Sequence, residues 1–143
     1  MSEGKPVLIQ VVSVQEDAQR ERQTLRRIYS GEVQRLPRGR MLRYTETDET
    51  GEHTHVAFER AEDGGVRLRR KGACRTEMLL IPGCEAACVY ETPFGAMDLV
   101  VRTQEASWTE TDVSSHIALR YDVFVQGELL SRNTVTLTYR VKP

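Results

Sequence analysis

Apolar and polar residues alternate with a period of two along most of the chain. The alternation is clearest from Ile117 to Val125 and from Val135 to Val141, and it also covers the run from Met97 to Thr103. Alternation of this kind is typical of β-strands that bury one face. The best helical candidate, residues 15–25, is polar throughout and lies between two β-like runs. The pattern therefore predicts an all-β protein.

Turns rich in glycine and proline separate the alternating runs. The strands that we predict span residues 6–16, 21–35, 40–49, 54–61, 65–71, 75–81, 85–92, 96–105, 114–126 and 129–141. Short turns without crossover helices favour an antiparallel meander. Closing such a meander removes its exposed edges. We therefore predict a single domain over residues 1–143, an antiparallel up-and-down β-barrel of about 8–10 strands.

One stretch carries a specific motif. Residues 90–103 read Y-x-T-P-F-G-x-x-x-L-x-x-x-T, and single matches at Gly31, Tyr44, Glu46, Arg70, Gly72, Met78, Tyr121 and Asn133 accompany it. In these residues the chain resembles the YwiB-like family, a bacterial domain of unknown function with a calycin-like, lipocalin-related β-barrel. The adjacent Arg26 and Arg27 depart from the family pattern. The resemblance implies a barrel and a cytoplasmic bacterial origin, and it implies no catalytic residue.

The centre of that motif, Pro93-Phe94-Gly95, has two interpretations. Proline fixes φ and lacks an N–H, and glycine permits positive φ, so the tripeptide suits a hairpin corner. It also suits the rim of a ligand site, because barrel mouths are common binding sites.

Composition narrows the class of protein. Hydrophobic residues make up 39% of the chain and charged residues 29%, which is typical of soluble globular proteins. No stretch approaches the ~18 apolar residues that span a bilayer, and no secretory signal is recognisable. We therefore expect a cytoplasmic protein without a membrane partner.

The three cysteines predict free thiols. Their number is odd, and Cys84 and Cys88 on one strand would lie roughly 13 Å apart, too far for a disulfide or a shared metal. We expect all three to be buried and structural.

Charge is distributed in blocks of alternating sign. Residues 20–43 hold eight arginines and two glutamates, residues 44–63 hold seven acids and one arginine, and residues 66–75 hold five bases and no acid. Blocks on neighbouring strands predict cross-strand ion pairs. The alternative is a basic outer face for RNA or another polyanion, built from Arg38, Arg40, Arg43, Arg67, Arg69, Lys71 and Arg75. Only 6% of the residues are aromatic, which disfavours binding of single-stranded nucleic acid.

Arg70 is the foremost candidate for a binding residue. Alternation places it on the apolar face with Val66 and Leu68, where an arginine needs a carboxylate partner. Glu46, Glu77 and Glu91 are the candidate partners. Arg70 either extends to the barrel rim or holds an anionic group of a ligand in the mouth. The predicted ligand-binding residues are Arg70, Tyr44, Glu46, Tyr90, Thr92 and Tyr121.

Other residues are weaker candidates for binding or catalysis. His53 and His55 share one face of a strand, but Val56 and Phe58 mark the opposite face as the core, so we expect exposed histidines rather than a metal site. The carboxylates at Asp48, Glu49, Glu62 and Asp63 fall at hairpin tips. Trp108, in a polar segment, either plugs a barrel end or contacts a partner. No nucleophile motif, phosphate loop or dinucleotide fingerprint is present, so we predict no cofactor and no catalytic residue. The leading hypothesis is a binding module for a small ligand, and a homodimer is possible.

Overall fold

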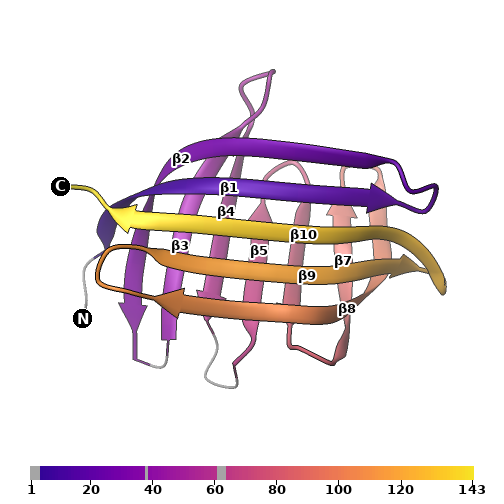
Figure 1. Cartoon of the computed structure of the whole chain (residues 1–143). Helices are drawn as coiled ribbons and strands as arrows, with labels where there is room; N and C mark the ends of the chain where they lie inside the picture. Colours follow the sequence, from indigo (N-terminus) through magenta and orange to yellow (C-terminus); the bar gives the residue numbers. More distant parts are fainter. Residues whose placement is uncertain (1–3, 38, 61–63) are drawn as a thin grey trace.

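The computed structural model describes residues 4–37, 39–60 and 64–143, which form a closed antiparallel barrel (Figure 1). The strands are β1 (Lys5–Asp17), β2 (Arg22–Leu36), β3 (Gly39–Thr47), β4 (His53–Arg60), β5 (Val66–Lys71), β6 (Arg75–Leu80), β7 (Glu85–Thr92), β8 (Gly95–Glu110), β9 (Ser115–Val125) and β10 (Glu128–Val141). Arg38, Glu62, Asp63 and the predicted strand end at Ala61 lie outside the described residues. No helix in the described part of the chain is long and apolar enough to cross a membrane.

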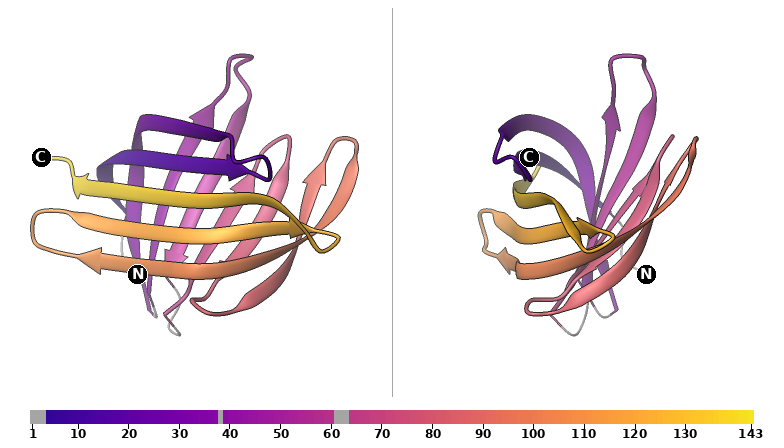
Figure 2. Two further views of the ribbon diagram at one scale, coloured as in Figure 1. Left: turned by 45° about the vertical axis from the view of Figure 1, so that its right-hand side comes forward. Right: turned by 90° about the vertical axis from the view of Figure 1, so that its right-hand side faces the viewer.

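Each strand pairs with its neighbours in the chain, and β1 closes the barrel by pairing with both β2 and β10. The predicted up-and-down topology is therefore confirmed. The barrel is flattened into two layers whose strands cross steeply. β1, β2 and β8–β10 form one layer, and β3–β7 form the other behind it (Figures 1 and 2).

The core lies between the two layers. Alternate residues of each strand point inward, and Val7, Ile9, Leu42, Ile117 and Leu137 are fully buried. This is the period of two seen in the sequence, because successive side chains of a strand point to opposite faces.

Strand β8 is longer than its sequence pattern predicts. We predicted its end at residue 105, but it continues to Glu110. A β-bulge lies between Thr103 and Glu105, where the pairing with β9 shifts by one residue. Before the bulge Val101 and Thr103 are buried, whereas after it Ala106 and Trp108 are buried. After the bulge, even-numbered rather than odd-numbered residues point inward. A prediction that assumes unbroken alternation therefore ends β8 too early.

One end of the barrel is filled by side chains. Trp108 is 6% exposed, and its indole N–H donates to the hydroxyl of Tyr139 at 2.8 Å. Beside them Glu110 forms an ion pair with Arg40 and lies 3.8 Å from Arg60. We call this group the closed end. Of the two roles that the sequence left open for Trp108, the structure shows the buried side chain at a barrel end, although the residue belongs to strand β8 rather than to a polar loop.

The other end, which we call the mouth, lies where β1–β2, β3–β4 and β5–β6 turn. There β2 separates from β3, since the pairs between them run only from Gly31↔Tyr44 to Leu36↔Gly39. The first half of β2, Arg22 to Ser30, is paired with β1 alone in the described ladders. Gly31 marks the point of separation, and a Cβ there would lie 2.4 Å from the backbone oxygen of Arg43.

The cysteines are free, as predicted, but the prediction that all are buried is wrong. Cys84 is exposed, and Cys74 and Cys88 are half-buried. Cys84 lies in the β6–β7 turn, where its carbonyl accepts a hydrogen bond from the Thr103 N–H at 3.1 Å. Because the turn lies outside the inner face of the sheet, the side chain of Cys84 reaches the surface.

Candidate functional site

Arg70 and Glu46 form an ion pair on the inner surface of the barrel at the mouth. Glu46 lies on β3 and Arg70 on β5, and both project inward across β4, which separates these two strands. Of the three partners that the sequence left open for Arg70, the structure selects Glu46. The side chains remain 38% and 25% exposed, so the pair lies where the core meets the opening.

Three tyrosines surround this ion pair. The rings of Tyr29 and Tyr44 stack with their centroids 4.6 Å apart. Burial raises the pKa of Tyr44, and the charge of Glu46 raises it further while that of Arg70 opposes the change. Burial also raises the pKa of Tyr121, again against the charge of Arg70. Phenol groups from β2, β3 and β9 are thus held neutral around one guanidinium–carboxylate pair.

These groups line a cavity of ≈ 450 Å³ in the mouth. One part of its wall is apolar and consists of Val11, Leu25, Phe58, Leu68, Met78 and Val135. The charged and phenolic groups form the rest, together with short polar side chains at the rim. A cavity with an apolar wall and a few convergent polar groups is the usual form of a small-molecule site.

Four of the six predicted site residues, Tyr44, Glu46, Arg70 and Tyr121, come together in this cavity. Tyr90 and Thr92 do not line it. Tyr90 projects inward opposite Thr76, and a hydrogen bond with Cys74 is the main cause that raises its pKa.

Thr92 holds the β7–β8 turn. Its hydroxyl donates to the carbonyl of Gly95 at 2.9 Å and accepts from the N–H of Phe94 at 3.1 Å. Gly95 has φ of 133°, and Phe94 is 99% exposed. The tripeptide Pro93-Phe94-Gly95 is therefore a hairpin corner.

Arg27, Tyr29 and Asn133 are polar residues of the cavity wall that were not among the predicted site residues. Arg27 and Tyr29 lie on the half of β2 that has left β3, where neither face is covered, so no clean alternation marks the inward side. Their register against Val11 and Ile9 of β1 would have placed them inside. Asn133 was among the residues that matched the family pattern, which gave it no role.

Thr76 places a buried hydroxyl close to the ion pair. It is paired with Arg70 across the β5–β6 ladder and is 8% exposed. Burial raises the pKa of the Cys88 thiol, and a hydrogen bond with the Thr76 hydroxyl partly offsets that rise.

The charge blocks of the sequence pair across neighbouring strands. Arg67 and Arg69 lie 3.3 and 3.4 Å from Glu77, and Arg69 lies 3.9 Å from Glu59. Arg43 contacts Glu32 at 2.6 Å. These pairs support the structural interpretation of the charge pattern over a continuous basic face.

The histidines are exposed, as predicted. The rings of His53 and His55 lie 2.9 and 3.2 Å from the hydroxyls of Thr47 and Thr45 on β3. Within the described ranges, histidine, cysteine and acidic side chains form no cluster of three that could hold a metal ion. Asp48 accepts hydrogen bonds from Thr50 and Glu52 and holds the β3–β4 turn, and the bond from Thr50 is the main cause that lowers its pKa.

Residues 9–137 match a family described as a domain of unknown function, DUF1934. The chain belongs to this family. Among solved structures, the barrel is similar to the ywiB protein from Bacillus subtilis, with a TM-score of 0.85 and 21% sequence identity, over 99% of this chain and 96% of that one. The resemblance to the YwiB-like family is therefore confirmed, whereas the calycin-like relationship stays a prediction. No curated protein matches the chain.

Proposed function

We propose that this DUF1934 barrel is a non-catalytic binding module that holds a small amphipathic molecule in its mouth. The observation that carries the proposal is the cavity of ≈ 450 Å³ into which Arg70, Glu46 and three tyrosines converge. Small barrels either fill their interior with side chains or hold one small ligand, and this barrel fills only its closed end.

The chemistry of the cavity favours an amphipathic ligand over a bare anion. Glu46 already neutralises Arg70, so an anion alone would have to displace a paired carboxylate. A ligand with an apolar body also buries surface against Phe58, Leu68 and Met78, at roughly 25 cal/mol per Å² of apolar area. Its anionic group would take donors of Arg70, with Arg27 as a second cation on the opposite wall.

The experiment has two parts. Native mass spectrometry of the protein purified from its own host tests for a bound molecule, which is then identified under denaturing conditions. In parallel, the apo protein is titrated with 8-anilinonaphthalene-1-sulfonate, an amphipathic anion, and its fluorescence is followed. We expect saturation with one site, and weakening by at least about tenfold in Arg70→Met, because charge-assisted hydrogen bonds contribute about 1.5–3 kcal/mol.

The matched control is Arg67→Met. Arg67 lies three residues earlier on the same strand but projects outward, where it pairs with Glu77. It should leave dye binding within about twofold of the parent. A clean apo mass together with equal effects of the two substitutions would reject the mouth as the binding site.

A further inference from the structure

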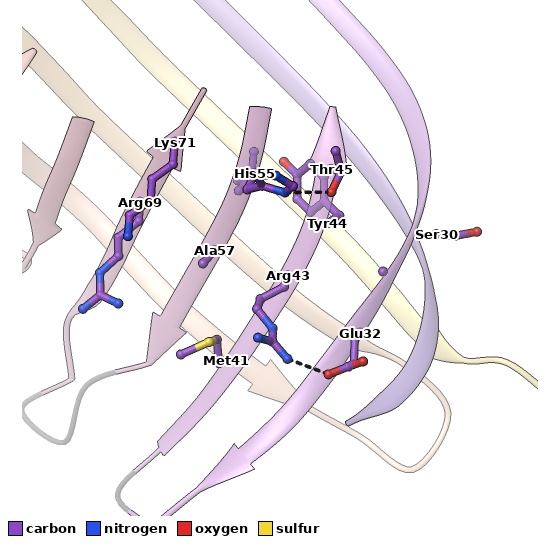
Figure 3. Close-up of a pocket in the computed structure, with 12 residues that line it drawn as sticks. Ser30, Glu32, Met41, Arg43, Tyr44, Thr45, His55, Ala57, Arg69 and Lys71 are labelled. Carbon is purple, nitrogen blue, oxygen red and sulfur yellow. Dashed lines mark hydrogen bonds and ion pairs between the residues drawn. The ribbon is translucent and has the colours of Figure 1, made fainter. Parts of the chain in front are cut away.

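A groove of ≈ 650 Å³ lies outside the barrel, on the outer face of β2–β5. It is lined by basic side chains from three neighbouring strands (Figure 3). Arg43 comes from β3, His55 from β4, and Arg69 and Lys71 from β5. The proposed function uses the inner face of the same sheet, so the two sites are distinct, although Tyr44 borders both.

The ladder register builds a notch at the centre of this groove. Ala57 of β4 is paired with Arg43 on one side and with Arg69 on the other. Strands that flank a common neighbour lie about 10 Å apart, so two guanidinium groups stand on either side of a residue whose side chain is one methyl group. Figure 3 shows Ala57 on β4 between Arg69 and Arg43, with the side chain of Met41 nearby.

A second pair of groups follows two residues further along the strands. His55 is paired with Lys71, and the His55 ring lies 3.2 Å from the hydroxyl of Thr45. Two residues along a strand correspond to roughly 7 Å. The groove therefore presents two arginines in one row and a lysine with an imidazole in the next.

The charge of the lining is positive. Arg43, Arg69 and Lys71 contribute three positive charges and Glu32 one negative charge, a net of +2 with neutral His55. Glu32 on β2 and Glu77 on β6 stand on the far sides of the arginines, whereas Glu59 on β4, two residues along from Ala57, lies 3.9 Å from Arg69. Arg43 contacts Glu32 through Nη2, Arg69 contacts Glu77 through Nε and faces Glu59 with Nη2, and a guanidinium group has five N–H donors in all. Both arginines thus retain donors for an anion.

We propose that this groove binds the phosphate group of a small phosphorylated molecule, seated over Ala57 between Arg43 and Arg69. A phosphate group carries up to two charges and accepts bidentate hydrogen bonds from arginine. Exposed ion pairs such as Arg43–Glu32 are weak, so a doubly charged anion competes with them. Lys71 and His55 contact a second anionic group of the ligand, and Met41 provides an apolar surface at the other side.

The test uses inorganic phosphate and pyrophosphate as probes. Each is titrated into the labelled protein, and the backbone amide shifts are followed by two-dimensional NMR. We expect saturable shifts at Arg43, Ala57 and Arg69, with pyrophosphate binding more tightly than phosphate. The double variant Arg43→Gln/Arg69→Gln should lose at least about tenfold in affinity.

Two further variants separate a built site from general surface charge. Ala57→Leu leaves every charge in place but fills the notch, and it should also lose at least about tenfold. Arg67→Gln removes a cation of similar exposure from the same face of β5, outside the groove, and it should change affinity less than about twofold.

Three outcomes would overturn the proposal. The first is unchanged binding in folded Ala57→Leu and in the double arginine variant. The second is an equal loss in Arg67→Gln. The third comes from a short single-stranded RNA titrated in parallel: much tighter binding than pyrophosphate, weakened equally by Arg67→Gln and Arg75→Gln, would assign the surface to a polyanion instead.

Discussion

The closed end and the mouth of the barrel are built from similar side chains with opposite results. Each holds an arginine–glutamate pair beside tyrosine, Arg40–Glu110 at one end and Arg70–Glu46 at the other. At the closed end Trp108 fills the space between the layers and satisfies its N–H on Tyr139. At the mouth there is no comparable filler, and a cavity remains.

The difference teaches that residue type alone does not decide whether a barrel end is filled by side chains or keeps a cavity. Two features of the backbone decide it here. The bulge in β8 turns Trp108 inward at one end. At the other end β2 leaves β3 beyond Gly31 and draws its side chains away from the opposite wall. Four measurements test this contrast, from the largest expected effect to the smallest.

Trp108→Ala should show the largest effect. Removal of a buried tryptophan leaves a cavity, so we expect the free energy of unfolding to fall by about 3–5 kcal/mol. Tyr29→Ala at the half-open mouth should cost only about 1 kcal/mol, because its ring is partly solvated already. Urea denaturation of both variants measures the contrast, and similar losses at the two sites would contradict it.

High pH should weaken the fold through its buried tyrosines. Burial raises the pKa of Tyr44, Tyr121 and Tyr139 above the ordinary value of about 10. A raised pKa in the folded state means that the folded protein holds protons which the unfolded chain has released. The resulting stability is complete below about pH 10 and is lost as pH rises through the folded pKa.

Tyr44→Phe isolates the contribution of one tyrosine. At pH 11 it should remove up to about 1.4 kcal/mol of the alkaline loss, since one pKa unit corresponds to that free energy. Denaturant melts of the parent and the variant at pH 8 and pH 11 give the comparison. An identical alkaline loss in both proteins would show that Tyr44 ionises without unfolding.

Substitution of the two glutamates should have smaller effects on stability. Glu110→Gln leaves Arg40 and Arg60 without their shared carboxylate and should cost about 1 kcal/mol. Glu46→Gln frees Arg70 beside water in the mouth, so it should cost less and should tighten the binding of an anionic dye. Thermal melts with and without the dye measure both effects, and a weaker dye affinity in Glu46→Gln would contradict this account.

The cysteines should differ in reactivity without a change in stability. Cys84 is exposed in a turn, whereas Cys88 is half-buried on the inner face, where burial raises the pKa of its thiol. Iodoacetamide at neutral pH should therefore modify Cys84 first, as peptide mass mapping would show. Faster modification of Cys88 would mean that the barrel interior is more open than the structure indicates.

The fold was largely predictable because apolar and polar residues alternate along most strands and so mark which side chains point inward. Alternation and turn residues located all ten strands, and most ends agree within one or two residues. The exceptions have a local cause. An inserted residue at the β8 bulge changes the parity, so Trp108 was assigned to a loop, and Cys84 was expected to be buried although its turn leaves the sheet.

The candidate site was predictable only in part. Alternation identified Arg70 as an inward cation, and the resemblance pointed to Tyr44, Glu46 and Tyr121. The sequence could not show that Glu46 is the partner of Arg70. The two residues lie on β3 and β5, and they meet because both strands flank β4, not because of their spacing in the chain. Arg27 and Tyr29 were not predicted, because the exposed first half of β2 shows no alternation of apolar and polar residues.

The separation of β2 from β3 beyond Gly31 has a consequence for the kinetics of exchange. From Arg22 to Ser30, β2 can move away from β3 without breaking a ladder hydrogen bond between them, while β1 stays paired with β10. The stack of Tyr29 on Tyr44 is one contact that this movement would break. For the guest molecule that we propose, entry and exit would then leave the β1–β10 ladder intact, and the width of this opening, more than the cavity behind it, would set the residence time.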